Sequence, residues 1–102
     1  MKHPINFKLS ALAKNDLENI FKFTIRNWGE IKAREYAQKL SDGFVLLSQS
    51  PKIGKQRNDI YLNALSFPVG SHIIFYSINN NIDSKIEIAR VLHKQMDIEK
   101  LF

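Results

Sequence analysis

The sequence predicts an α+β fold in which an antiparallel helical hairpin packs on a mainly antiparallel sheet. The expected order is β-α-α-β-β-β, with an N-terminal strand and a short C-terminal tail or helix. Two observations predict it. Apolar residues recur at helical spacing between Ser10 and Pro51, whereas the flanking segments alternate or form short apolar runs separated by turn residues. A chain of 102 residues with 44% hydrophobic content is the size of one folded domain, 1–102.

The first element is a short strand that follows Pro4. Ile5, Phe7 and Leu9 alternate with polar residues, as expected of a strand with one buried face. Ser10 comes next and can cap a helix, because its hydroxyl oxygen can accept a hydrogen bond from an early helical amide. The strand therefore leads directly into the first helix.

Two helices follow, joined by a short connection at Gly29, which suits a helix end because glycine tolerates a left-handed conformation. The short connection predicts an antiparallel hairpin. The predicted buried faces comprise Ala13, Leu17, Ile20, Phe21, Thr24 and Trp28 in the first helix, and Ala33, Tyr36, Ala37, Leu40, Phe44 and Leu47 in the second. Gly43 indicates either close packing or a locally weak helix. Pro51 ends the second helix at Ser50, and Gly54 permits a tight turn.

Three strands are predicted in the second half of the chain, at residues 60–67, 70–78 and 84–92. Pro68 with Gly70 separates the first two. The run from Asn79 to Asp83 forms the second turn, because Asn and Asp hydrogen-bond locally and tolerate positive φ. The three strands form a meander, and the final "MDIEKLF" is the tail.

Several classes of protein and site are disfavoured by composition. Cysteine is absent, so disulfides and thiolate chemistry are excluded and a cytoplasmic location is expected. Neither a signal peptide nor a membrane span is expected, because the apolar runs are short. His72 and His93 fall on predicted neighbouring strands without a third ligand at a suitable spacing, so we expect no metal and no cofactor. Hydrogen bonds to the backbone, Ser71 or Asp97 are the expected use of these histidines.

The chain carries a net charge of +5, which favours an acidic partner such as nucleic acid, the ribosome or an acidic protein tail. The densest basic cluster is "KIGKQR", with Lys52, Lys55 and Arg57. A solvated loop is the favoured interpretation of this cluster, ahead of a phosphate-binding loop.

Arg90 interrupts the last strand. Ile86, Ile88, Arg90 and Leu92 share one parity, so the apolar face breaks at Arg90. Either a bulge near Ala89 shifts the phase, or the second sheet face is partly covered by the tail. In both cases Arg90 needs an acidic or carbonyl partner. We expect Arg90, His93 and Asp97 to form a structural closure in which Arg90 pairs with Asp97 or another carboxylate and holds the tail against the sheet.

Five blocks in this order resemble the RelE/ParE superfamily of bacterial toxins, and its ParE-type branch in particular: "LSALAKNDLENI", "NWGEIKAREYAQKL", "SPKIGKQR", "FPVGSHIIFY" and "RVLHKQMD". The resemblance runs nearly end to end. It implies a toxin of a type II toxin-antitoxin system that inhibits DNA gyrase without being an enzyme, with plasmid stabilisation as the associated role. It also implies a ParD-like antitoxin whose flexible arm wraps the toxin in a hetero-oligomer.

Candidate contacts to the target or partner follow from this resemblance and from the residues themselves. Phe23 and Ile25 fall off the buried stripe of the first helix and suit an amphipathic antitoxin arm. Lys52, Lys55 and Arg57 are the basic candidates.

Relatives of the RelE type offer an alternative, a ribosome-dependent endoribonuclease acting on mRNA. In that case Arg57 and Arg90 would stabilise negative charge and His93 would move protons. Against it, RelE-type chains place a tyrosine near the C-terminus, whereas no tyrosine follows Tyr76 here and Phe102 cannot transfer a proton. Leu65 stands where many ParE-type relatives have an arginine, so an inert relative that only binds its antitoxin is a third interpretation.

Overall fold

The computed structural model of the protein describes residues 7–79 and 85–102. Its elements are β1 (Phe7–Leu9), α1 (Ala11–Trp28), α2 (Glu30–Gln49), η1 (Pro51–Ile53), β2 (Lys55–Gln56), β3 (Leu65–Val69), β4 (His72–Ile78), β5 (Ile86–His93) and η2 (Ile98–Leu101). The strands form one sheet in the order β1-β5-β4-β3-β2, in which the β1–β5 pair is parallel and the other pairs are antiparallel. The predicted α+β fold is confirmed.

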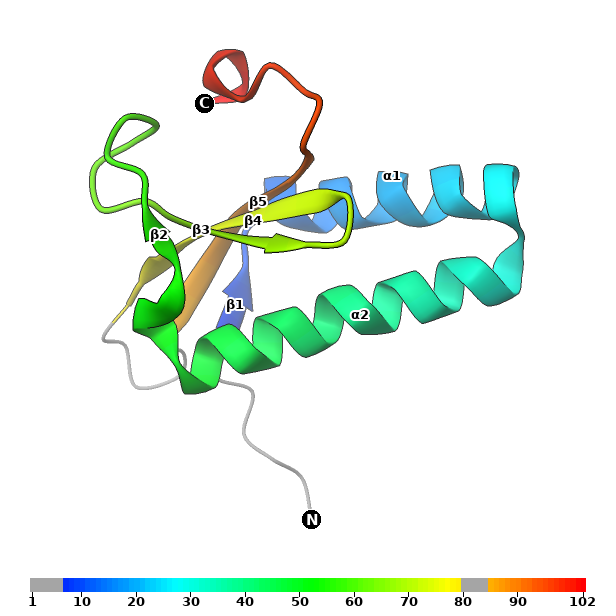
Figure 1. Cartoon of the computed structure of the whole chain (residues 1–102), viewed down its shortest axis with the longest axis horizontal. Helices are drawn as coiled ribbons and strands as arrows, with labels where there is room; N and C mark the ends of the chain where they lie inside the picture. The colour runs from blue at the N-terminus through cyan, green and yellow to red at the C-terminus, as the bar shows by residue number, and fades with distance from the viewer. Residues whose placement is uncertain (1–6, 80–84) are drawn as a thin grey trace.

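The helical hairpin forms as predicted. Ser10 caps α1, because its hydroxyl oxygen accepts a hydrogen bond from the Ala13 amide at 3.0 Å and its hydroxyl proton is donated to the Ala89 carbonyl at 2.7 Å. Gly29 separates the helices with a φ of 90°. Figure 1 shows α1 and α2 running antiparallel and extending past the sheet, with α2 and η2 on opposite sides of it.

The main core lies between the hairpin and the sheet, and includes Leu40, Phe44 and Leu47 of α2 with Ile74, Tyr76, Ile86 and Ile88 of the strands. Gly43 marks close packing rather than weakness, because a Cβ atom there would lie 2.9 Å from Cγ2 of Val69. The chain turns just before Gly54, in η1, where the Ile53 amide donates to the Ser50 carbonyl at 3.3 Å, and Gly54 itself is extended with a φ of −70°. A side chain at Gly54 would collide with the Tyr76 hydroxyl, which accepts a hydrogen bond from the Gly54 amide.

Two predictions about buried residues are wrong, and both concern the hairpin. Trp28 is 70% exposed and Ala37 is also exposed, although both were placed on buried faces. Trp28 ends α1 at the far end of the hairpin, where Figure 1 shows no strand beside the helices. Helical spacing identifies a face, but it does not say how much of that face the sheet covers.

The predicted strand at residues 60–67 is also wrong over most of its length. Residues 57–64 form a looped turn, closed by a hydrogen bond from the Arg57 amide to the Ala64 carbonyl at 2.7 Å. Asn63 adopts a positive φ of 63° within this turn. The strand β3 starts only at Leu65 and continues through Pro68, because β2 pairs only with Leu65 and Ser66 and leaves the Pro68 position on a free edge.

Two other predicted features fall partly outside the described residues. Ile5 of the predicted first strand lies there, while Phe7 and Leu9 pair with Ile86 and Ile88 of β5. The predicted turn from Asn79 to Asp83 also lies outside, except for Asn79, whose amide donates to the Lys85 carbonyl at 2.6 Å.

A bulge at Ala89 resolves the phase problem of β5. Phe75 pairs with Arg90 and Tyr76 pairs with Ile88, so Ala89 is the extra residue of β5. After the bulge Val91 joins the same core as Ile86 and Ile88, which restores one apolar face.

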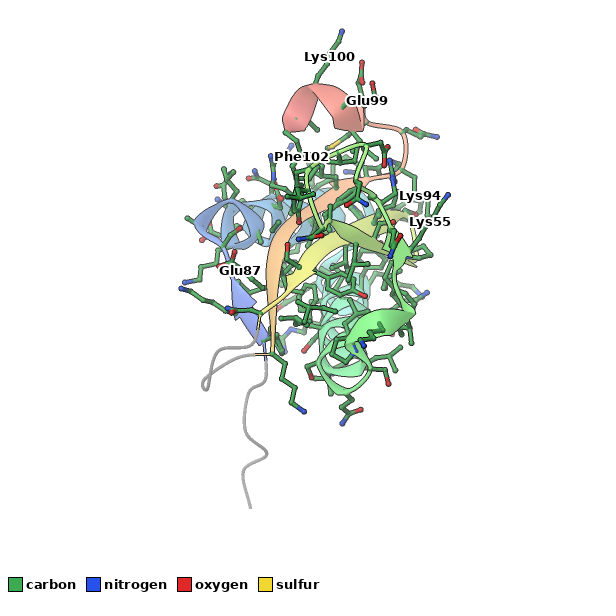
Figure 2. All side chains as sticks on the ribbon, turned by 90° about the vertical axis from the view of Figure 1, so that its left-hand side faces the viewer. Lys55, Glu87, Lys94, Glu99, Lys100 and Phe102 are labelled. Carbon is green, nitrogen blue, oxygen red and sulfur yellow. The ribbon has the colours of Figure 1, made fainter. Side chains whose placement is uncertain are left out.

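The second sheet face is covered as well. Phe75 and Leu92 are buried there although they lie outside the main core. The ring of Phe102 packs 5.1 Å from Phe75 and 5.5 Å from Tyr61, between centroids. Figure 2 shows Phe102 between η2 and the sheet, while Glu99 and Lys100 point away from the sheet. Among the described residues no helix is long and apolar enough to cross a membrane.

Candidate functional site

Arg90 has a carboxylate partner, and it is Asp16 of α1 rather than Asp97. Its Nε and Nη2 atoms donate to the two Asp16 oxygens at 2.8 and 2.9 Å, and the Val91 amide donates to Asp16 at 3.0 Å. Asp97 instead forms an ion pair with Lys100 at 3.5 Å. The reason is topological, because β1 pairs only with residues 86–88 and leaves the next stretch of β5 facing α1. The bidentate bond to Asp16 raises the pKa of Arg90.

Arg90 also connects α1 to the tail. Its Nη1 atom donates a hydrogen bond to the Leu101 carbonyl at 3.2 Å. The expected link between Arg90 and the tail is therefore present, but a backbone carbonyl makes it. This cluster of Asp16, Arg90 and Leu101 joins three elements through one guanidinium group and offers no free nucleophile or base.

His93 lies on the helix side of the sheet and lines a hollow together with Met96 at the start of the tail. Its Nδ1 atom accepts a hydrogen bond from the Gln95 amide at 3.1 Å, and its ring centroid is 5.2 Å from that of His72 in an edge arrangement. His72 contacts the Tyr36 hydroxyl at 2.6 Å from Nδ1, so Tyr36 of α2 replaces the Ser71 and Asp97 side chains expected as partners. Burial and the neighbouring His93 lower the pKa of His72 to about 4.

Arg57 lies on the opposite face. Its guanidinium carbon is 5.7 Å from the centroid of the Phe75 ring, and its Nε and Nη2 atoms each donate to an Asp59 oxygen at 3.1 Å. The hydrogen bond to Asp59 raises the pKa of Arg57. Phe75 and His72 are three residues apart on β4, so their side chains point to opposite sheet faces. Arg57 and His93 are thus separated by the sheet, and the structure does not gather the three nuclease candidates.

Lys52 and Lys55 are exposed; Lys52 lies within η1 and Lys55 begins β2. The ion pairs of the described residues do not include either lysine. Arg57 differs from both, because its side chain is mostly covered by Phe75 and Asp59. The basic cluster read from the sequence therefore divides into two solvated lysines and one arginine engaged in the fold.

Two adjoining hollows of about 560 and 510 Å³ lie on the helix side. They share Phe23, His72 and His93, and we call them together the α1 groove. Its other defining residues are Trp28, Tyr36 and Met96. Phe23, a predicted partner contact because of its position off the buried stripe, is 60% exposed and lines both hollows. Ile25, the other predicted contact on α1, is 40% exposed and lines neither hollow.

Sequence reasoning missed most of the α1 groove. Trp28 and Tyr36 were assigned to the core because of their helical spacing, and Met96 was assigned to the tail. A spacing pattern cannot distinguish a residue that packs on the sheet from one that lines an open edge of the same interface. The off-stripe position of Phe23 was the available signal.

The α1 groove suits binding rather than catalysis. Its walls are mainly apolar, and Lys32, Glu35 and Lys39 contribute charges to its lining. Within the described part of the chain, no group of three or more histidine, aspartate or glutamate side chains is arranged to hold a metal ion. An apolar groove with a charged edge has the properties of a site for an amphipathic peptide segment.

The chain matches known families along most of its length. Residues 7–98 match the family described as the ParE toxin of the type II toxin-antitoxin system parDE. Toxin ParE1 of Caulobacter vibrioides is 30% identical over 91 residues, which cover 89% of this chain and 91% of that one. Toxin ParE1 of Mycobacterium tuberculosis is 30% identical over 94 residues, which cover 92% and 94% of the two chains.

Solved structures show the same fold. A chain of the chromosomal ParDE toxin-antitoxin system from P. aeruginosa superposes with a TM-score of 0.73 at 18% identity, over 90% of this chain and 98% of that one. A chain of the toxin-antitoxin complex RelBE2 from Mycobacterium tuberculosis gives a TM-score of 0.58 at 20% identity, over 90% and 100% of the two chains. At these identities the superpositions establish the fold.

Proposed function

The chain belongs to the ParE family of toxins of type II toxin-antitoxin systems, and on this premise we propose that it inhibits DNA gyrase in the cytoplasm and is neutralised by a ParD-like antitoxin. The α1 groove is the proposed docking site for the antitoxin arm. The observation that carries this assignment is the exposed Phe23 ring beside an apolar hollow, on a chain of net charge +5.

Gyrase inhibition is favoured over RNA cleavage because the groups needed for cleavage lie apart. Arg57 is held by Asp59 on one sheet face, and Arg90 is held by Asp16. His93 lies on the other face from Arg57, next to His72. General acid-base chemistry on a phosphate needs the proton-transferring group and the charge-stabilising groups around one atom.

The target is tested by two parallel reactions. Purified protein is added to a gyrase supercoiling and cleavage reaction, and separately to translating ribosomes with mapping of mRNA ends. We expect inhibition in the gyrase reaction, abolished by prior addition of the antitoxin, and no new mRNA ends. Codon-positioned cuts without any effect on gyrase would overturn the proposal, and so would no effect in either reaction.

The docking site is tested by a matched pair of variants. Phe23→Ser removes an exposed ring that lines the α1 groove, whereas Ile25→Ser removes an exposed side chain of the same helix outside it. We expect Phe23→Ser to weaken antitoxin binding by at least tenfold, because large apolar side chains at interface centres carry much of the binding energy. Ile25→Ser should change it by less than about threefold. Equal affinities for both variants would contradict the assignment.

A further inference from the structure

The α1 groove contains a histidine whose tautomer is fixed by the backbone. Nδ1 of His93 accepts a hydrogen bond from the Gln95 amide, so this atom carries no proton. The neutral ring must then carry its proton on Nε2. His93 therefore presents a hydrogen-bond donor at Nε2.

His72 also carries its ring proton on Nε2, but here the partner of Nδ1 is the Tyr36 side chain and not the backbone. The Tyr36 oxygen accepts the Ser71 amide at 3.0 Å and has one proton to donate, either to Nδ1 of His72 at 2.6 Å or to the Val69 carbonyl at 3.3 Å. We assign the hydroxyl proton to the shorter contact, with Nδ1 of His72 as its acceptor. Nδ1 of His72 is then an acceptor, and its Nε2 carries the ring proton.

Both Nε2–H groups are available to a ligand. Nε2 has no hydrogen-bond partner in either ring within the described residues, although both Nδ1 atoms are engaged. No fully buried side-chain nitrogen or oxygen in the same part of the chain lacks a partner, so neither Nε2 atom is sealed off from solvent. Both rings line both hollows and their centroids are 5.2 Å apart. Both rings thus border one space, and a ligand there with two acceptor atoms can meet both of them.

The charges around the groove favour an anionic acceptor. Asp16 is already paired with Arg90, and Glu35 with Lys32 at 3.7 Å. Lys39 lines the groove and forms no ion pair with any described residue. The acidic groups of the groove are therefore compensated, while a cation remains at its edge.

We infer that His72 and His93 form a carboxylate-binding point in the α1 groove, which holds a glutamate or aspartate side chain of the antitoxin arm. This inference rests on the proposed function, since it assumes that the arm occupies the groove. The two Nε2–H groups donate to the carboxylate oxygens, and Lys39 adds attraction from the edge. Apolar contacts at Phe23 would supply affinity. The paired imidazoles would select an acidic side chain at the position of the antitoxin arm that lies beside them.

Two substitutions of His93 test the Nε2–H donor independently of the rest of the imidazole ring. In His93→Asn the side-chain oxygen can replace Nδ1 and accept the Gln95 amide, but the Nε2–H donor is lost. In His93→Gln an amide N–H lies near the former Nε2 position. With the cognate antitoxin at fixed salt, we expect His93→Asn to raise Kd by roughly tenfold or more, as for loss of a hydrogen bond to a charged group. His93→Gln should stay within about threefold of the parent.

A substitution scan of the antitoxin arm identifies the carboxylate. Each glutamate is changed to glutamine and each aspartate to asparagine, and each variant is measured against the parent toxin and against His93→Asn. We expect one acidic residue whose loss matters with the parent and has no effect with His93→Asn. If Phe23→Ser weakens binding but no acidic residue is coupled to His93, the inference fails alone. If Phe23→Ser also binds normally, the docking site itself is refuted.

A measurement on the unmodified toxin is independent of any variant. Nitrogen chemical shifts of the histidine rings report which nitrogen carries the proton. We expect the Nε2–H tautomer for both His72 and His93 at neutral pH, and a shift change at both Nε2 atoms when the antitoxin is added. Protonation at Nδ1 in either ring, or unchanged Nε2 shifts in the complex, would overturn the inference.

Discussion

At the scale of single residues, Asp16 is the group on which the edge of β5 depends. Its carboxylate accepts two hydrogen bonds from Arg90 and one from the Val91 amide, and it is buried. Removing it leaves a guanidinium and an amide without partners in a poorly solvated place. One aspartate thereby supports both a strand edge and the attachment of the tail.

Asp16→Ala should therefore destabilise the protein by about 3–5 kcal/mol, the cost of breaking a buried ion pair from one side. Asp97→Ala is the matched control, because among the described residues Asp97 forms an ion pair only with the exposed Lys100, and its loss should cost less than about 0.5 kcal/mol. Urea unfolding followed by circular dichroism measures both. Similar losses for the two variants would show that Asp16 has no special role.

His72 predicts a pH dependence of stability. Its pKa is about 4 in the folded protein against an ordinary 6.5, so the unfolded chain binds the proton more readily. Above pH 6.5 the ring is neutral in both states and His72 does not reduce the stability. As the pH falls from 6.5 towards 4, the unfolded chain takes up the proton first, so the free energy of unfolding decreases. Because solvent reaches part of the ring and screens it, we expect this decrease to be about 1–2 kcal/mol.

His72→Asn keeps an acceptor for the Tyr36 hydroxyl but cannot titrate. Its urea midpoint should fall less than that of the parent between pH 6.5 and 4, because the remaining dependence comes from carboxylates present in both proteins. Parallel curves for the two proteins would contradict the assignment of this dependence to His72.

Sequence patterns predicted the place of single residues in the helices better than they predicted which distant residues these contact. Ser10 as the cap of α1 and Gly29 as its end follow from local rules, and both are confirmed. The partner of Arg90 could not be identified in this way, because Asp16 is 74 residues away and many carboxylates were available. Tyr36 with His72 is a similar case, since a tyrosine at helical spacing is indistinguishable from an ordinary core residue.

At the scale of elements, the tail and the loop of residues 57–64 form a small second layer on the sheet. Phe102 packs against Phe75 and Tyr61, while Arg57 stands over Phe75. The predicted strand at residues 60–67 failed over residues 60–64, where Tyr61 packs against Phe102 in this layer without joining the ladder. Period-two spacing alone does not separate a strand from a loop that packs on one.

Phe102→Ala should lower the stability by about 1–2 kcal/mol, since the ring is partly exposed and its loss uncovers Phe75. For a domain of this size that corresponds to a melting point lower by about 4–15 °C. Lys100→Ala is the control on the same turn, because Lys100 is largely exposed and should leave the melting point nearly unchanged. Equal melting points for the two variants would show that Phe102 does not stabilise the fold.

At the scale of the whole molecule, the sheet separates two surfaces that carry different groups of residues. The helix side carries the α1 groove with Phe23 and the histidine pair, while the other side carries the tail and Arg57. The resemblance in sequence indicated the fold and the family correctly. It did not indicate that His93 and Arg57 lie on opposite sides, since that depends on the bulge and on the parity of β4.

The bulge at Ala89 also determines which mutations β5 tolerates. Before it, the residues that face the main core are the even-numbered Ile86 and Ile88; after it, the odd-numbered Val91 faces that core, while Leu92 is buried on the other sheet face. When polar substitutions along β5 are scored for folded protein, the odd-numbered position of Glu87 should therefore tolerate them, whereas the odd-numbered position of Val91 should not.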